Sequence, residues 1–137
     1  MGVGNINAGD DGCGVMAVDM LEKKGLKRCF SCGMVPENYL CKVSEMKPEL
    51  VLIIDAVDFG GNPGEIRYLK GEEVFSGIST HTAGLDLSAR FIRESSGAEV
   101  AVLGIQPKNT KGLMSEEVKS SVKAIAERIS KKLCMNQ

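Results

Sequence analysis

Two apolar segments, Leu50–Asp55 and Glu99–Ile105, place the strongest limit on the fold of this chain. The first segment is apolar without the alternation that a strand with one wet face would show. Such a run is typical of a central strand in a parallel sheet, where helices cover both faces. The second segment is expected to be another buried strand. Together they predict a sheet that runs through the middle of the molecule.

Helical and extended segments alternate along the rest of the chain. Helices are predicted at about residues 12–24, 37–46, 85–94 and 115–133, a weak strand at about 27–32, and an exposed or edge strand at Glu65–Lys70. The last helix is the best defined, because its apolar residues form one stripe and its two ends carry opposite charges. This order predicts an α/β fold, a three-layer sandwich in which helices flank a mostly parallel, twisted sheet. We find no repeat or linker, and expect a single domain over residues 1–137.

Glycine is concentrated at the N-terminus, where Gly2, Gly4, Gly9, Gly12 and Gly14 all fall within fourteen residues. Such a density predicts a loop whose backbone closely approaches another group. A glycine loop that leads into a helix usually follows a strand, and only one residue precedes Gly2. We therefore expect the first strand of the sheet to be missing.

Charge and composition argue against several classes of protein. Lys and Arg number 17 and Asp and Glu number 18, so the chain lacks the basic surface of a nucleic-acid-binding protein. Aromatic residues make up only 4%, too few for a platform that stacks bases. The longest apolar run is too short to cross a bilayer, and the N-terminus has no apolar signal segment. Five cysteines, an odd number, fit reduced thiols in a cytoplasmic protein.

Acidic residues and the one histidine stand at junctions between predicted elements. Asp10 and Asp11 begin the first helix, where a single carboxylate is enough for a cap and the second is available to a cation or an amide. Asp55 ends the strongest strand, and ligands of open α/β sheets bind outside the carboxyl ends of strands. Asp58 follows in a turn. His81, the only histidine, precedes a helix.

This topology can bring Asp11, Asp55 and His81 to one edge of the sheet. Two carboxylates and one imidazole would form an open site for a divalent metal, although these ligands do not discriminate among nickel, zinc and iron. Each residue also has an ordinary interpretation. In that interpretation Asp11 caps a helix, Asp55 caps a turn, and His81 is a polar loop residue.

Other chemistries have weaker support. A dinucleotide motif would need a third glycine at Asn7, and paired carboxylates would repel a pyrophosphate. Cys29 and Cys32 form a CxxC motif that could be a redox pair, but a structural zinc site lacks further ligands. Cys13 would need His81 as its base to act as a nucleophile, and the chain has no GxSxG elbow for a serine hydrolase.

Several motifs, taken in order, resemble one family. They are Gly2-Val3-Gly4-Asn5, Gly9-Asp10-Asp11-Gly12-Cys13-Gly14, Pro36-Glu37-Asn38, Ile54-Asp55-Ala56-Val57-Asp58, Asn62-Pro63-Gly64-Glu65-Ile66, Thr80-His81 and Leu103-Gly104-Ile105-Gln106-Pro107. This pattern is similar to that of the hydrogenase maturation endopeptidases, and most similar to the branch that serves hydrogenase 3, of the formate hydrogenlyase type. The resemblance spans the chain from Gly2 to the final helix.

The resemblance implies an endopeptidase that removes the C-terminal extension of a nickel–iron hydrogenase large-subunit precursor after nickel insertion. It implies that Asp11, Asp55 and His81 bind the metal, and that the nickel is supplied by the precursor rather than held permanently. We further expect Asp11 or Asp55 to activate water.

We expect Gly4, Asn5, Gly12 and Asp58 to line the substrate site. Two alternatives remain at this point. One is a non-catalytic module that binds a nickel-loaded large subunit, and the other is a nucleotide-binding regulatory domain.

Overall fold

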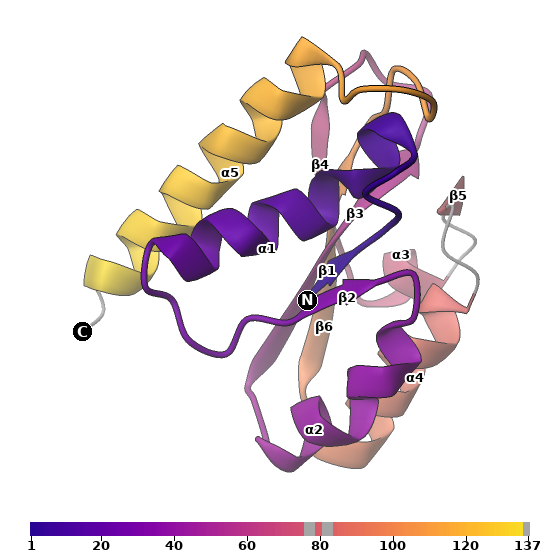
Figure 1. Cartoon of the computed structure of the whole chain (residues 1–137). Coiled ribbons are helices and arrows are strands. Elements are labelled where there is room, and N and C mark those ends of the chain that lie inside the picture. The colour runs from indigo at the N-terminus through magenta and orange to yellow at the C-terminus, as the bar shows by residue number, and fades with distance from the viewer. Residues whose placement is uncertain (76–78, 81–83, 136–137) are drawn as a thin grey trace.

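A mixed β-sheet crosses the molecule with helices on both of its faces (Figure 1). The computed structural model describes residues 1–75, 79–80 and 84–135. The strands are β1 (Gly2–Val3), β2 (Ser31–Gly33), β3 (Leu50–Asp58), β4 (Ile66–Lys70), β5 (Ser79–Thr80) and β6 (Glu99–Ile105). The main sheet has the order β2-β1-β3-β6-β4, and β5 pairs separately with β3.

The central pair of strands, β3 and β6, runs parallel over its whole length, from Leu50 opposite Glu99 to Ala56 opposite Ile105. Strands β1 and β2 continue the parallel arrangement on one side. On the other side β4 is antiparallel to β6 and forms the edge of the sheet. The predictions of two buried central strands and of an edge strand near residues 65–70 are therefore confirmed.

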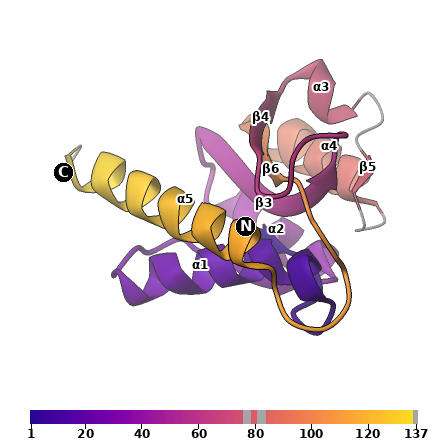
Figure 2. The same ribbon diagram turned by 90° about the horizontal axis from the view of Figure 1, so that it is seen from above.

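Helices form two layers, one on each face of the sheet. One layer contains α1 (Cys13–Lys23) and α5 (Glu116–Met135), which lie side by side in both views (Figures 1 and 2). The other contains α2 (Leu40–Glu45), α3 (Glu72–Phe75) and α4 (Leu85–Ser96), whose apolar residues join a second core. Two 3₁₀ turns, η1 (Gly9–Gly12) and η2 (Pro36–Tyr39), precede α1 and α2. The predicted three-layer α/β sandwich is thus the observed fold.

The central position of β3 explains why its sequence does not alternate between apolar and polar residues. Val51 and Ile53 pack into the core below α2 and α4, whereas Ile54 and Ala56 pack into the core below α1 and α5. Both faces of the strand are buried, so apolar residues are required at successive positions.

The prediction that the first strand is missing is wrong. Gly2 and Val3 form a short strand, β1, that pairs with both β2 and β3. The amide of Ile54 donates to the carbonyl oxygen of Met1 at 2.9 Å, which continues the β1–β3 ladder by one residue. A two-residue strand flanked by glycine has too few side chains to show any periodicity, which is why the sequence pattern did not reveal it.

The weak strand predicted at about residues 27–32 begins later, as β2 at Ser31. Arg28 has a φ of 61°, in the left-handed region, so the chain turns at this residue and cannot be extended there. The short elements α3 and β5 were not predicted. No helix in the described ranges of the chain has both the length and the apolar character needed to span a membrane.

Close packing of α1 on the sheet depends on Gly14. A Cβ atom at this position would collide with the main-chain oxygens of Ile54 and Val3. The helix therefore lies directly against β1 and β3, and this contact holds η1, at the start of α1, beside the carboxyl ends of both strands.

Candidate active site

Two buried carboxylates lie where β1 and β3 end. Asp55 belongs to β3 and is completely buried, and Asp11 belongs to η1 and is almost completely buried. Gly4 lies between them: a Cβ at Gly4 would collide with the main-chain oxygen of Asp11 and would lie 3.6 Å from Oδ1 of Asp55. The φ of Gly4 is 132°, which glycine adopts readily. The structure therefore brings these three sequence-predicted residues together.

The Asp11 carboxylate has one satisfied oxygen and one that is not. Its Oδ2 accepts a hydrogen bond from the main-chain N–H of Asn5 at 3.0 Å. Its Oδ1 is buried and has no hydrogen-bond partner among the described residues. A buried carboxylate oxygen without a donor is costly, so this atom points to a ligand that the protein does not itself supply. On Asp55, Oδ1 accepts from the N–H of Ala56 at 2.8 Å.

Asp10 has a different task from its neighbour. It is completely buried, and it accepts four hydrogen bonds from the segment that leads into α5. The donors are Lys108 N at 2.8 Å, Asn109 N at 3.1 Å, Ser115 N at 2.7 Å and Ser115 Oγ at 2.9 Å. Burial alone would raise the pKa of Asp10, but these donors outweigh it and lower the pKa below its ordinary value. Asp10 thus fixes η1 to a distant loop.

The sequence analysis treated Asp10 and Asp11 as a pair at a helix start, and neither side chain caps α1. The role of Asp10 could not be found from sequence, because its partners lie about one hundred residues further along the chain. A second missed residue is Gln106, which follows β6 and binds the turn after β3. Gln106 Oε1 accepts from Phe59 N at 2.9 Å and from Gly61 N at 3.1 Å.

Asp58 was predicted in a turn after a strand ending at Asp55, but β3 continues to Asp58, and the Asp58 side chain binds the turn that follows. Its Oδ1 accepts from Gly60 N at 3.1 Å and from Gln106 Nε2 at 3.1 Å. Gln106 therefore joins β6 to the turn that follows Asp55 and positions the Asp58 side chain within it. The Gly-Ile-Gln-Pro motif was the one available signal for Gln106. The predicted contact of Asp58 with substrate stays a prediction.

His81, the third predicted ligand, lies outside the described residues. In β5, the described segment before it, Thr80 pairs with Val57 of β3, two residues beyond Asp55. Within the described ranges, no group of three or more His, Cys, Asp or Glu side chains has an arrangement that could hold a metal. Metal binding by Asp11, Asp55 and His81 therefore stays a prediction.

Gly4 and Gly12, the two glycines of the predicted site, are both required by packing within the protein. A Cβ at Gly12 would lie 2.9 Å from the Cα of Ile6, and Gly4 is similarly confined by Asp11. Internal packing of the β1–η1 loop therefore explains both glycines, and their contact with substrate stays a prediction.

Comparison with known proteins agrees with this geometry. A family model described as hydrogenase maturation protease (HycI) matches residues 17–132. The chain belongs to the hydrogenase maturation protease family. The protease is 34% identical over 134 residues to the Hydrogenase 3 maturation protease of Escherichia coli K12, over 93% of this chain and 85% of that relative.

Solved structures of the family confirm the fold of the protease. The crystal structure of the nickel–iron hydrogenase maturation protease HycI from Thermococcus kodakarensis KOD1 superposes with a TM-score of 0.86, at 32% identity, over 95% of this chain and 87% of that one. The solution structure of the endopeptidase HycI from Escherichia coli gives a TM-score of 0.80, at 30% identity, over 94% and 86% of the two chains. The protein is thus an enzyme of the endopeptidase class, and this membership favours catalysis over the nucleotide-binding alternative.

Cys13, the cysteine considered as a nucleophile from the sequence, is unsuited to that role. Cys13 is completely buried, and its pKa is raised far above the ordinary value by burial, with a further contribution from the charges of Asp55, Asp11 and Asp10. A thiol in this position stays protonated and unreactive. Burial also raises the pKa of Cys32 to about 11. Cys29 and Cys32 are free thiols whose sulfurs contact two different main-chain oxygens.

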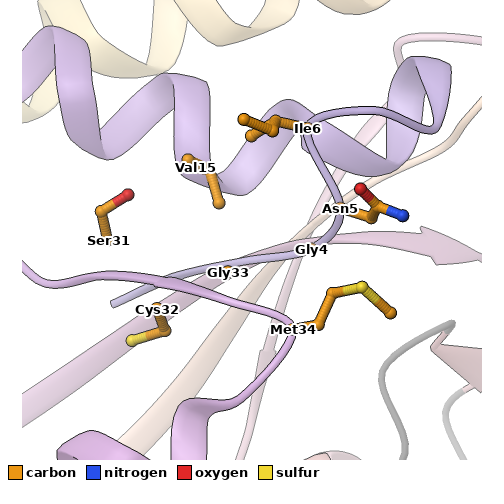
Figure 3. Close-up of a pocket in the computed structure, with 8 residues that line it drawn as sticks. All are labelled: Gly4, Asn5, Ile6, Val15, Ser31, Cys32, Gly33 and Met34. Atoms are coloured by element: carbon orange, nitrogen blue, oxygen red, sulfur yellow. The ribbon is translucent and has the colours of Figure 1, made fainter.

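An open pocket of about 330 Å³ adjoins the two carboxylates of the protease (Figure 3). One wall is the loop after β1, the other is β2 with the residue that follows it, and α1 contributes the floor. The lining residues are Gly4, Asn5, Ile6, Val15, Ser31, Cys32, Gly33 and Met34. Gly4 and Asn5 belong both to this pocket and to the surroundings of Asp11.

Proposed function

We propose that this enzyme removes the C-terminal extension from the large-subunit precursor of a nickel–iron hydrogenase, after nickel has entered the precursor, and that the partner hydrogenase is of the hydrogenase 3 type. Family membership and the name of the Escherichia coli relative support this choice of substrate. The observation that carries the proposal is the buried Oδ1 of Asp11, which has no hydrogen-bond partner among the described residues; Gly4 lies between the main chain of Asp11 and the side chain of Asp55.

Nickel enters the proposal as part of the substrate. Carboxylate oxygens and an imidazole nitrogen are suitable ligands for a borderline divalent ion, and the unsatisfied oxygen of Asp11 fits such a ligand set. Asp11, Asp55 and His81 would contact an ion that the precursor already holds. This contact would select the nickel-loaded precursor and set its scissile bond beside the two carboxylates.

Hydrolysis then requires a base for the attacking water. A carboxylate within hydrogen-bond reach of that water can remove its proton in the transition state. We assign this task to Asp11 or Asp55: Oδ2 of Asp11 accepts from the N–H of Asn5, and Oδ1 of Asp55 lies 3.6 Å from the position that a Cβ of Gly4 would take. We further propose a cytoplasmic protease that does not use a thiolate: burial raises the pKa of the Cys13 thiol, and five cysteines, an odd number, fit a reducing compartment.

A cleavage assay with nickel-loaded precursor tests the proposal. The wild-type enzyme should convert the precursor to a faster-migrating product, and Asp11→Asn, Asp55→Asn and His81→Ala should each reduce the rate by at least about 100-fold. Asp86→Asn is the matched control, because Asp86 is an exposed carboxylate on α4 and its loss should leave the rate unchanged.

Two results would contradict the proposal. Wild-type enzyme that binds the nickel-loaded precursor without cutting it would support the non-catalytic alternative. Full activity in both aspartate variants would show that the site lies elsewhere.

A further inference from the structure

We propose that the pocket between β1 and β2 receives an apolar, uncharged side chain of the substrate, from a residue within about two positions of the scissile bond. This inference rests on the proposed function and adds a determinant of specificity to it. The first argument is that the pocket is continuous with the surroundings of Asp11. Asn5 lines the pocket, and its main-chain N–H is 3.0 Å from Oδ2 of Asp11.

The residues that line the pocket disfavour a charged side chain in it. None of the eight lining residues is charged, and Ile6, Val15 and Met34 supply the large apolar surfaces. The adjacent carboxylates of Asp11 and Asp55 would repel an acidic group. The occupant is therefore apolar, and desolvation of its surface would favour binding.

The apolar side chains at the pocket are exposed, which indicates that a binding partner covers them. Ile6 is 67% exposed and Met34 is 59% exposed, and Val35, the next residue, is also exposed. A single exposed apolar side chain needs no explanation, but two that line one concave site, with a third next to them in the sequence, indicate an interaction surface. In Figure 3 the Met34 side chain extends along the mouth of the pocket on the side of Asn5, while Ile6 lies over α1.

The dimensions suit one side chain. Water occupies about 30 Å³ per molecule in the liquid, so a volume of about 330 Å³ holds roughly ten waters. This is enough for a large aliphatic side chain together with part of its backbone. An extended peptide advances about 3.3–3.6 Å per residue, which is why the occupant must be close to the bond that is cut beside Asp11.

The experiment measures kcat/KM for nickel-loaded precursors in which each residue within three positions of the cut is changed in turn to Ala, Leu or Asp. The enzymes are wild type, Ile6→Ala, Met34→Ala and Met34→Lys. Leu87→Ala is the matched control, because Leu87 is 67% exposed, as is Ile6, and lies on α4 in the opposite helix layer.

We expect one substrate position at which Leu is preferred over Asp by about 100-fold with wild-type enzyme. Ile6→Ala and Met34→Ala should each reduce kcat/KM about tenfold, chiefly through KM, and weaken the preference at that position alone. Met34→Lys should improve cleavage of the Asp substrate relative to wild type. Circular dichroism should show unchanged folding, since both side chains are exposed.

The inference is overturned if wild-type enzyme cleaves the precursor but the pocket variants match Leu87→Ala at every substrate position. That result would leave the proposed function intact. If wild-type enzyme does not cleave the nickel-loaded precursor at all, the proposed function fails and the inference fails with it.

Discussion

Replacement of Asp10 by Asn tests whether this buried carboxylate fixes the active-site turn. The substitution keeps the shape of the side chain but exchanges one acceptor oxygen for an NH₂ group, which then faces the N–H and O–H donors that Asp10 binds. Loss of a hydrogen bond to a charged group costs about 1.5–3 kcal/mol. Lys108 and Asn109 are exposed, so water can replace the acceptor for part of the set. We therefore expect a loss of about 2 kcal/mol in the free energy of unfolding, out of the roughly 5–15 kcal/mol typical of a domain.

Urea unfolding of wild type and Asp10→Asn, followed by circular dichroism between pH 3 and pH 8, measures this loss. The pKa of Asp10 is lowered in the folded state, so its stabilising effect is fully present above the unfolded pKa of about 4 and is lost as the pH falls through the folded pKa. The difference between the two proteins should be constant near neutral pH and shrink below about pH 4. Asp86→Asn, at an exposed position, should show neither effect. A difference below about 0.5 kcal/mol at pH 7, or one that grows on acidification, would refute the reasoning.

Three further predictions concern other residues of the site. Gln106→Ala removes the acceptor of two main-chain N–H groups in the turn after β3, so urea unfolding should show a loss of about 1–3 kcal/mol, and an unchanged midpoint would contradict the role given to this side chain. Cys13→Ala should retain most of its cleavage activity, because burial keeps the thiol protonated; a rate lowered by about 100-fold in a folded variant would revive the thiol nucleophile. The double variant Cys29→Ser, Cys32→Ser should also remain active in the cleavage assay, and a folded but inactive protein would show that the CxxC motif has a function.

Much of the fold was predictable, because its core strands have a strong pattern. Strand β6 has the bounds predicted for it, and α5 begins and ends within two residues of the predicted limits. Both elements are long and bury a regular set of apolar residues. In contrast, β1 and β5 contain two residues each and owe their existence to hydrogen bonds with β3 rather than to their own sequence.

The candidate site was predictable only in part. Asp11 and Asp55 could be singled out because each lies near a predicted junction between elements, and the structure places both beside Gly4, although β3 continues past Asp55 to Asp58. The tasks of Asp10 and Gln106 depend on contacts between distant segments, which no local pattern encodes. The pocket likewise forms from three separate segments, and its lining could not be assembled without the fold.

The two edge strands of the main sheet influence whether copies of the protein associate with one another. An unprotected border strand is a template for pairing with a further chain. Here one border, β2, is only three residues long, and the other, β4, carries the exposed cations Arg67 and Lys70, with Arg67 held over the ring of Phe59 at 4.4 Å. Neither edge strand of the main sheet, as the structure describes it, is both long and uncharged, so a second copy of the chain cannot readily extend the sheet. The short edge strand β2, beside the pocket, remains accessible to a partner peptide but is too short to promote fibre formation.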